Sequence, residues 1–376
     1  MPNGTLNLLH NSCIEKTLFN RYINLDMITP LLNKWRKIIE VETIGKSVNE
    51  EDIHALTIGN GPIKILMWSQ MHGNESTTTK ALFDLFNFLD GQTEESKSIT
   101  RACTITVVPM LNPDGARAYT RLNANGVDLN RDAQVLSQPE SKVLRSLFDE
   151  FQPDFCFNLH GQRTIFSAGN TDNSAIVSFL APAQDAKCSI TENRKIAMDV
   201  ISVMNSNLQL TITNNVGIYD DTFNINCVGD TFQSLNVPTI LVEAGHFSND
   251  YSRELTRRFI FDALVVALNY ISVPEIARDG HSAYLKIPQN KKLFFDIIIR
   301  NTEVGDIAIQ YEESLNNDRI EFVPKVEKID DLSEFYAHLE VNAEGNEVIV
   351  AKGTSLKLGN QIDYVKINNE KFSFLL

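Results

Sequence analysis

Residues 63–76, IKILMWSQMHGNES, contain the two features on which the interpretation of this chain depends. The segment starts with the apolar run IKILMW, which has the length and composition of a buried β-strand. It stops at His72-Gly73-Asn74-Glu75, where a histidine and a glutamate stand three residues apart beside a glycine that lets backbone approach closely. An imidazole and a carboxylate in this spacing can bind one metal ion, and catalytic zinc sites often combine two histidines with one glutamate. The rest of the chain must therefore supply a second histidine and a general base.

The composition is that of a soluble globular protein, with 43% hydrophobic and 22% charged residues among 376. This length suffices for one large core and a smaller second domain. The formal net charge of −14 argues against a general nucleic-acid-binding protein, which usually carries a basic face. No apolar segment approaches the roughly 20 residues that span a membrane, so we expect no membrane partner.

The cysteines and the N-terminal segment bear on the compartment. The five cysteines are widely spread, odd in number and include no C-x-x-C motif. This pattern is typical of reduced thiols in a reducing compartment. The N-terminal segment lacks a basic region followed by a long apolar stretch, so the sequence does not predict a signal peptide. We therefore expect a cytoplasmic protein.

Predicted strands and helices alternate along most of the chain. Near-continuous apolar strands, at residues 63–68, 103–109, 155–159 and 239–243, are followed by helices with apolar stripes. This alternation predicts an α/β sheet covered on both faces. A helical lead-in at residues 1–40 and a strand-turn-strand at residues 41–57 precede it. We expect this part, residues 1–282, to form the catalytic domain.

The sequence pattern changes near Ala283. From residue 283 to 376 the chain consists of short β-rich segments, such as LFFDIIIR and EVIVAKG, separated by turn signals. We predict a small all-β C-terminal domain here. Three roles remain open for it: to wall the active site, to mediate assembly into a homo-oligomer, or to stabilise the chain.

Polar side chains follow three further predicted strands. Asn112 comes after VVPML, His160 after FCFNL, and Glu243 ends the apolar strand TILVE. In open α/β sheets, ligand sites collect at the carboxyl ends of the strands. A glutamate at the end of a buried strand is costly unless it is paired or functional. The sequence therefore predicts a site at this edge of the sheet.

The combined motif resembles the zinc carboxypeptidases of the M14 type, which are related to the succinylglutamate desuccinylase and aspartoacylase group. The match in order and strand placement covers residues 40–272. It rests on His72-x-x-Glu75, Asn112-Pro113-Asp114-Gly115, Arg121, the run GVDLNRD at residues 126–132, His160 and Glu243. The resemblance implies an α/β/α sandwich around a mixed, mostly parallel sheet.

The resemblance also implies roles for individual residues. His72, Glu75 and His160 would be the ligands of one zinc ion per chain, with a fourth position left for water. Glu243 would be the general base that takes a proton from that water. Arg121 would stabilise the developing oxyanion, with Arg117 as the alternative arginine.

Substrate binding is implied for three residues. Asn130 and Arg131 would hold the terminal carboxylate of the substrate, the arginine through its planar fork of donors. Tyr219 is the candidate for the aromatic lid residue of the family, chosen by its spacing before the base. The expected partner is therefore a peptide or an N-acyl amino acid with a free carboxylate.

Two features leave the substrate class open between peptidase and deacylase. His-Gly-Asn-Glu and the Glu-Ala-Gly around the base are similar to the desuccinylase and aspartoacylase type of deacylase. Asn-Pro-Asp-Gly and Asn-Arg-Asp are typical of peptidases. We expect a metallocarboxypeptidase that hydrolyses the C-terminal amide bond of a peptide, with an N-acyl amino acid deacylase as the alternative. A binding protein on an inactive hydrolase fold is disfavoured because every candidate ligand and the base are present.

Overall fold

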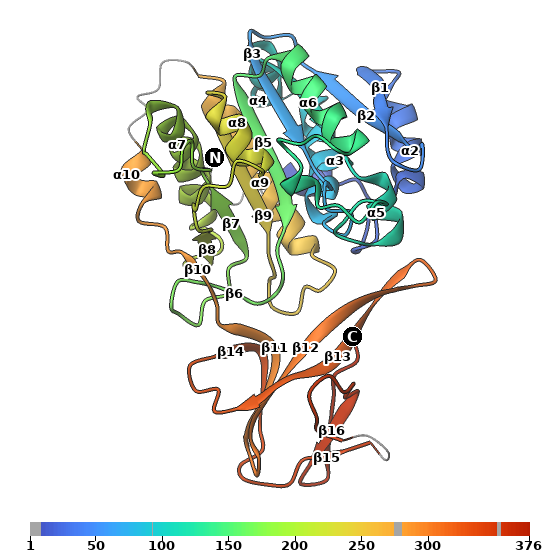
Figure 1. Cartoon of the computed structure of the whole chain (residues 1–376), viewed down its shortest axis with the longest axis vertical. Helices are drawn as coiled ribbons and strands as arrows, with labels where there is room; N and C mark the ends of the chain where they lie inside the picture. The colour runs from blue at the N-terminus through green and yellow to red at the C-terminus, as the bar shows by residue number, and fades with distance from the viewer. Residues whose placement is uncertain (1–8, 92, 274–279, 352–354) are drawn as a thin grey trace. The chain divides into compact units, whose positions relative to one another are not determined.

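The computed structural model describes residues 9–91, 93–273, 280–351 and 355–376. It divides into two compact units. The first comprises Met1–Gln162 and Ala175–Asn290, and the second comprises Arg163–Ser174 and Lys291–Leu376 (Figure 1). The second unit thus contains a short segment from the middle of the chain in addition to the C-terminal part. The predicted domain boundary after residue 282 stays a prediction.

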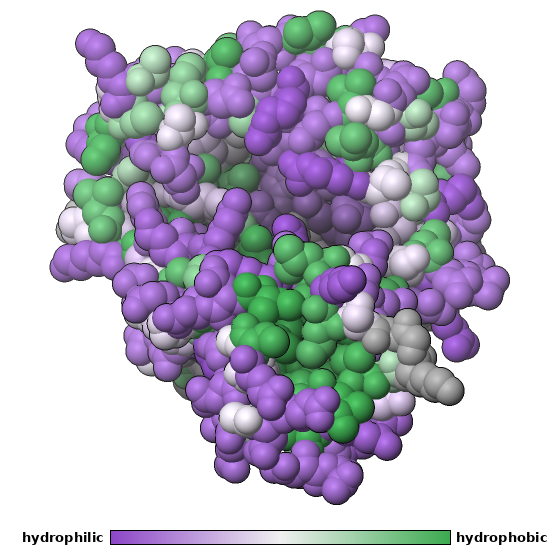
Figure 2. Space-filling view, turned by 60° about the horizontal axis from the view of Figure 1, so that its bottom comes forward, coloured by the Kyte–Doolittle hydropathy of each residue, from purple (hydrophilic) through white to green (hydrophobic). Residues whose placement is uncertain are grey.

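The second unit is built from short β-sheets. Its main sheet has the order β13-β12-β11-β14, and a smaller sheet has the order β15-β16-β17. Their apolar residues, among them Ile297, Ile309 and Val365, form a core of their own. Figure 2 shows apolar residues gathered over one face of this unit. The strands are β6 (Phe166–Ala168), β10 (Asn290–Lys292), β11 (Phe294–Thr302), β12 (Gly305–Asn316), β13 (Arg319–Asp330), β14 (Tyr336–Asn342), β15 (Ile349–Val350), β16 (Tyr364–Ile367) and β17 (Glu370–Ser373).

The first unit contains an eight-stranded mixed sheet in the order β1-β2-β4-β3-β5-β9-β7-β8. The central strands β4, β3, β5 and β9 run parallel. β1 and β2 pair antiparallel with their neighbours, whereas β7 is antiparallel to β9 and parallel to β8. Together with the small β-sheets of the C-terminal part, this confirms the predicted fold class. The strands are β1 (Glu40–Lys46), β2 (Asp52–Ile58), β3 (Ile63–Trp68), β4 (Cys103–Val108), β5 (Phe155–Gly161), β7 (Val177–Leu180), β8 (Val216–Ile218) and β9 (Thr239–Ala244).

Helices cover both faces of this sheet (Figure 1). Apolar residues of α3, α7 and α9 share one core with the sheet, and residues of α6 and α8 form a second core on the opposite face. The helices are α2 (Leu25–Trp35), α3 (Thr77–Leu89), α4 (Glu94–Ala102), α5 (Pro113–Ala118), α6 (Pro139–Phe151), α7 (Glu192–Leu208), α8 (Val228–Ser234), α9 (Glu254–Ile271), α10 (His281–Tyr284) and the 3₁₀ turn η1 (Leu129–Arg131). None of the helices among the described residues is long and apolar enough to cross a membrane.

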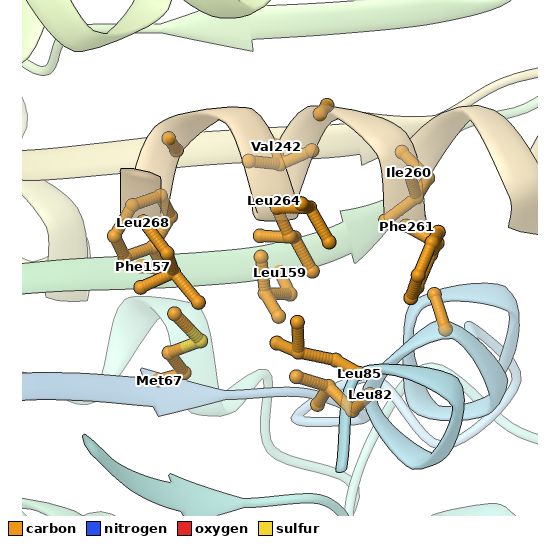
Figure 3. Close-up of a cluster of buried hydrophobic side chains, with 14 of the residues drawn as sticks. Met67, Leu82, Leu85, Phe157, Leu159, Val242, Ile260, Phe261, Leu264 and Leu268 are labelled. Atoms are coloured by element: carbon orange, nitrogen blue, oxygen red, sulfur yellow. The ribbon is translucent and has the colours of Figure 1, made fainter. Parts of the chain in front are cut away.

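The strand β3 shows how the sequence divides between the two cores. Ile65 and Met67 enter the α3/α9 core, whereas Leu66 and Trp68 enter the α6/α8 core. Successive residues of a strand point to opposite faces, so a continuous apolar run is what a strand buried on both faces requires. Figure 3 shows the first core, where Met67 and its neighbours on β5 and β9 face Leu264 and other side chains of α9.

Within the N-terminal lead-in, helix α2 covers only Leu25–Trp35, and residues 14–24 are irregular. Asn24 starts α2 because its side chain accepts a hydrogen bond from the Met27 N–H. The preceding segment is held by Asp84 of α3 and Arg257 of α9, both fully buried. The Arg257 guanidinium donates to both Asp84 oxygens, at 2.6 and 2.7 Å. The first eight residues of the predicted lead-in lie outside the described part of the chain.

The core on α9 can be tested with two leucines of the same helix. Leu264 is fully buried, whereas Leu255 is 42% exposed. We expect Leu264→Ala to lower the free energy of unfolding by about 3 kcal/mol, because it leaves a cavity in a packed core. The matched variant Leu255→Ala should cost less than about 1 kcal/mol. Urea titration of both variants measures the difference, and equal losses would contradict this packing.

Candidate active site

The candidate site lies at the carboxyl ends of β3, β5 and β9. His72 follows the end of β3, and His160 and Glu243 lie near the ends of β5 and β9. β5 and β9 are parallel neighbours, and their register pairs His160 directly with Glu243. Residues paired in this way lie on the same face of the sheet, roughly 5 Å apart. The sheet topology thus brings together residues that are far apart in the sequence.

A close approach of two turns shapes the His72–Glu75 segment. A Cβ atom added to Gly73 would lie 1.9 Å from the carbonyl carbon of Gly115, so only glycine fits there. Gly115 belongs to the Asn-Pro-Asp-Gly motif, in which the Asn112 side chain accepts from the Gly115 N–H and donates to the Met71 carbonyl. The Asn-Pro-Asp-Gly motif therefore supports the turn that carries the two predicted metal ligands.

The structure brings His72, Glu75 and His160 together. One candidate ligand atom from each lies within 4.8 Å of the others. His72 Nδ1 is 2.9 Å from Glu75 Oε1 and 3.1 Å from His160 Nδ1, and His160 Nδ1 is 3.0 Å from Glu75 Oε2. Two imidazole nitrogens and a carboxylate that converge on one point form a donor set that fits zinc.

The electrostatics of this cluster are those of a cation site. Burial alone would lower the pKa of His72, but the carboxylates of Glu75 and Asp128 outweigh it and raise that pKa to about 9. Burial would raise the pKa of Glu75, yet the two imidazoles hold it well below its usual range. Burial lowers the pKa of His160, which favours its neutral form. A carboxylate held ionised between imidazoles is suited to bind a metal cation.

Asp128 contacts one of the candidate ligands, although the sequence motifs did not suggest a role for it. Its Oδ1 atom lies 3.0 Å from His72 Nε2, the ring nitrogen that points away from the cluster. A histidine that binds metal usually donates its other N–H to a carboxylate, which fixes the ring and its tautomer. The imidazole and Arg121 outweigh burial and hold the pKa of Asp128 below its usual value. That expectation for metal-bound histidines is the signal that could have identified Asp128.

The structure separates the two candidate arginines. The Arg121 guanidinium lies at the cluster, with Nη1 3.2 Å from His72 Nδ1 and Nη2 donating to Asp128 at 3.0 Å. Arg117 instead donates to Asp26 at 2.8 Å and to Glu51 at 3.0 Å. Arg121 is therefore the arginine that the fold places beside the candidate metal ligands.

Asn130 and Arg131 lie on the turn η1, directly after Asp128. The Asn130 side-chain oxygen accepts from the Val228 N–H at 3.0 Å, which joins this turn to the start of α8. Its NH₂ group is the part of the amide that can donate to a ligand. Arg131 donates to the Asn130 carbonyl at 2.7 Å.

Glu243 is half-buried, and one of its carboxyl oxygens lies inside the protein. Its Oε2 atom is shielded from solvent and has no hydrogen-bond partner among the described residues. Burial, followed by the negative charge of Glu75, raises the pKa of Glu243 well above its usual value. A carboxyl group that favours the protonated form, beside a site for a cation, is suited to exchange protons.

Tyr219 follows strand β8 and lies within the same electrostatic environment. Burial raises the pKa of its phenol, and the charges of Glu243 and Glu75 raise it further. Its hydroxyl donates to Gln162 Oε1 at 2.8 Å. Tyr219 therefore lies near the base, although spacing alone suggested it.

Comparison with known proteins identifies the family. A family model described as zinc carboxypeptidase, peptidase M14, matches residues 26–253. The chain belongs to the zinc carboxypeptidase family, and zinc is the metal that this family implies. The resemblance inferred from the motifs is thereby confirmed.

Individual relatives match only part of the chain, at identities near 30%. An uncharacterized protein of Zymomonas mobilis is 31% identical over 132 residues, which cover 33% of this chain and 34% of that protein. Probable carboxypeptidase 2 of Arthroderma benhamiae is 29% identical over 110 residues, which cover 29% of this chain and 20% of that protein. The matches thus span about a third and a fifth of these relatives.

Two solved structures share the fold. A putative carboxypeptidase A from Shewanella denitrificans aligns with a TM-score of 0.56 at 18% identity, over 66% of this chain and 68% of its own. A metallo-carboxypeptidase from Burkholderia cenocepacia aligns with a TM-score of 0.53 at 17% identity, over 66% of this chain and 70% of its own. At these identities the likeness shows the fold alone.

Zinc binding tests the cluster directly. We expect the purified protein to bind about one zinc ion per chain and His160→Ala to lose it, because one of three ligands is removed. Asp128→Ala should weaken zinc binding roughly 10- to 100-fold, because it releases the His72 ring. Metal analysis and competition with a chelator measure both effects.

His281→Ala is the control, because His281 lies on α10 outside the cluster. An equal loss of zinc in this control, or full retention by His160→Ala, would contradict the assignment.

Proposed function

We propose that this protein is a zinc-dependent carboxypeptidase that hydrolyses the C-terminal amide bond of a peptide. The observation that carries the proposal is the convergence of His72, Glu75 and His160 at one edge of the sheet, with Glu243 paired beside them. Membership of the zinc carboxypeptidase family supports it independently.

The proposed metal ligands are His72, Glu75 and His160, which would hold one zinc ion per chain. When bound, zinc supplies a Lewis acid that polarises a carbonyl group and makes water more acidic. Asp128 holds the His72 ring in place through the 3.0 Å contact to Nε2.

Glu243 is the proposed general base. Burial and the nearby charge of Glu75 raise its pKa, and a bound cation would favour its ionised form. The carboxylate can then accept a proton from water and return it to the leaving amine. Arg121 is proposed to stabilise the oxyanion, since its permanent positive charge already lies at the cluster.

The substrate's terminal carboxylate is proposed to bind Asn130 and Arg131. Both follow Asp128 on the turn η1, so the anion site is fixed to the segment that orients His72. Arginine can grip a carboxylate with two parallel hydrogen bonds. Tyr219 is proposed to contact the bound substrate with its protonated hydroxyl.

The five cysteines are all free in the structure. Free thiols are typical of reducing compartments, so we propose a cytoplasmic location. Relatives such as probable carboxypeptidase 2 of Arthroderma benhamiae and carboxypeptidase SOL1 of Arabidopsis thaliana favour the peptidase over the deacylase alternative. It becomes an outcome of the substrate test.

The role of Glu243 is tested by Glu243→Gln, which keeps the shape of the side chain and removes its basicity. We expect kcat to fall roughly 10²- to 10⁴-fold, with zinc content unchanged. The control Glu42→Gln, at an exposed position of β1, should retain wild-type activity. Full activity of Glu243→Gln would disprove the mechanism.

The substrate class is tested by comparing three compounds side by side: a peptide with a free C-terminus, the same peptide with an amidated C-terminus, and an N-acetyl amino acid. We expect hydrolysis of the first alone. Arg131→Met should raise KM for it roughly 10- to 100-fold, because a charged hydrogen bond to the carboxylate is lost. Preferential hydrolysis of the N-acetyl amino acid would establish a deacylase instead.

A further inference from the structure

The side chain of Gln162 makes three hydrogen bonds beside the candidate site. It is buried, two residues after His160. Its Nε2 atom donates to the Ala175 carbonyl at 2.6 Å. Its Oε1 atom accepts from the Tyr219 hydroxyl at 2.8 Å and from Asn290 Nδ2 at 3.4 Å. One amide thus joins three segments that are distant in the sequence.

Gln162 itself and two of these partners, Ala175 and Asn290, are the residues at which the chain leaves or re-enters the first unit. Gln162 is the last residue before the excursion into the second unit, and Ala175 is the first residue after it. Asn290 is the last residue before the C-terminal part of the second unit begins. The Tyr219 hydroxyl therefore donates a hydrogen bond to Gln162, the junction residue that also contacts the other two junction residues.

The backbone of Gln162 is itself fixed. Its N–H donates to the Ala244 carbonyl at 3.0 Å, and its carbonyl accepts from Arg253 Nη2 at 2.6 Å. Arg253 also donates to the Ala244 carbonyl at 2.7 Å. The buried Arg253 guanidinium thus joins the ends of β5 and β9. Because the backbone of Gln162 is fixed in this way, its side-chain amide has a defined position.

Asn290 extends the network toward the base. Its Nδ2 atom donates to Ser178 Oγ at 2.9 Å, and Ser178 is paired with Glu243 across β7 and β9. A Cβ atom on Gly217 would lie 1.9 Å from Asn290 Oδ1, so a glycine two residues before Tyr219 makes room for this amide. The Ile218 N–H donates to the Pro288 carbonyl at 2.9 Å, which lays this segment along β8.

We propose that Gln162 is a positioning residue that, together with Asn290, holds Tyr219 in place for substrate binding. The inference rests on the proposed function, because Tyr219 is taken to contact the substrate. The hydrogen bond fixes the phenol before substrate arrives, so binding does not have to order this side chain. Its loss should therefore weaken binding and leave the chemical step intact.

A double-mutant cycle tests the inference. We expect Gln162→Met, which keeps the length of the side chain and removes both hydrogen-bonding groups, to raise KM for a peptide about fivefold and to change kcat by less than about twofold. In the Tyr219→Phe background, where the hydroxyl is absent, Gln162→Met should cause no further rise in KM. Gln209→Met, at the end of α7, is the control and should leave KM unchanged.

An unchanged KM in Gln162→Met, or an equal rise in the Tyr219→Phe background, would overturn the positioning role. A purely structural effect of Gln162 would give that equal rise, because it would not act through the tyrosine hydroxyl.

A readout without substrate separates this inference from the proposed function. If the wild type hydrolyses no peptide, the proposed function fails, and the network is then tested by limited trypsin digestion. Arg163 and Lys291, both exposed, directly follow Gln162 and Asn290. Gln162→Met should speed cleavage after these two residues about fivefold relative to cleavage after exposed Lys187. Equal relative rates would show that Gln162 does not hold the junctions.

Discussion

The register between β5 and β9 is the constraint on which the site depends. It pairs His160 with Glu243, so that a candidate ligand and the candidate base lie on the same face of the sheet. A slip of one residue in either strand would turn one of the two side chains to the opposite face. Leu159 and Val242, which directly precede His160 and Glu243, enter the α3/α9 core, and burial of these apolar residues holds the register.

The site also requires a balance of charge, because it lies at strand ends that are largely shielded from water. Glu75, Asp128 and Glu243 bring three carboxyl groups to a place where burial disfavours ionisation. Arg121 and the imidazoles of His72 and His160 offset this cost. Glu243 is offset least, because its Oε2 atom has no partner in the described part of the chain. A site of this kind is suited to bind a cation at one carboxylate and to transfer a proton at another.

The motifs identified the candidate site better than they identified its supports. His72, Glu75, His160 and Glu243 could be predicted because each stands at the end of an apolar strand, where the pattern is local. Asp128 received no role, since an acidic residue in a loop looks the same whether or not it contacts a histidine. Gln162 and Asn290 carry no signal in one sequence, because uncharged amides are common at turns and surfaces.

The sequence by itself determined the α/β class, the residue types of the candidate metal site and the family to which the chain belongs. These follow from strand periodicity and from short motifs, whose physical meaning does not depend on distant residues. Only the tertiary structure revealed that Arg121, and not Arg117, lies beside the candidate metal ligands, because Asp26 and Glu51 hold Arg117 elsewhere. It also revealed that Tyr219 is bonded to the junction residue Gln162, since this contact joins segments 57 positions apart in the chain.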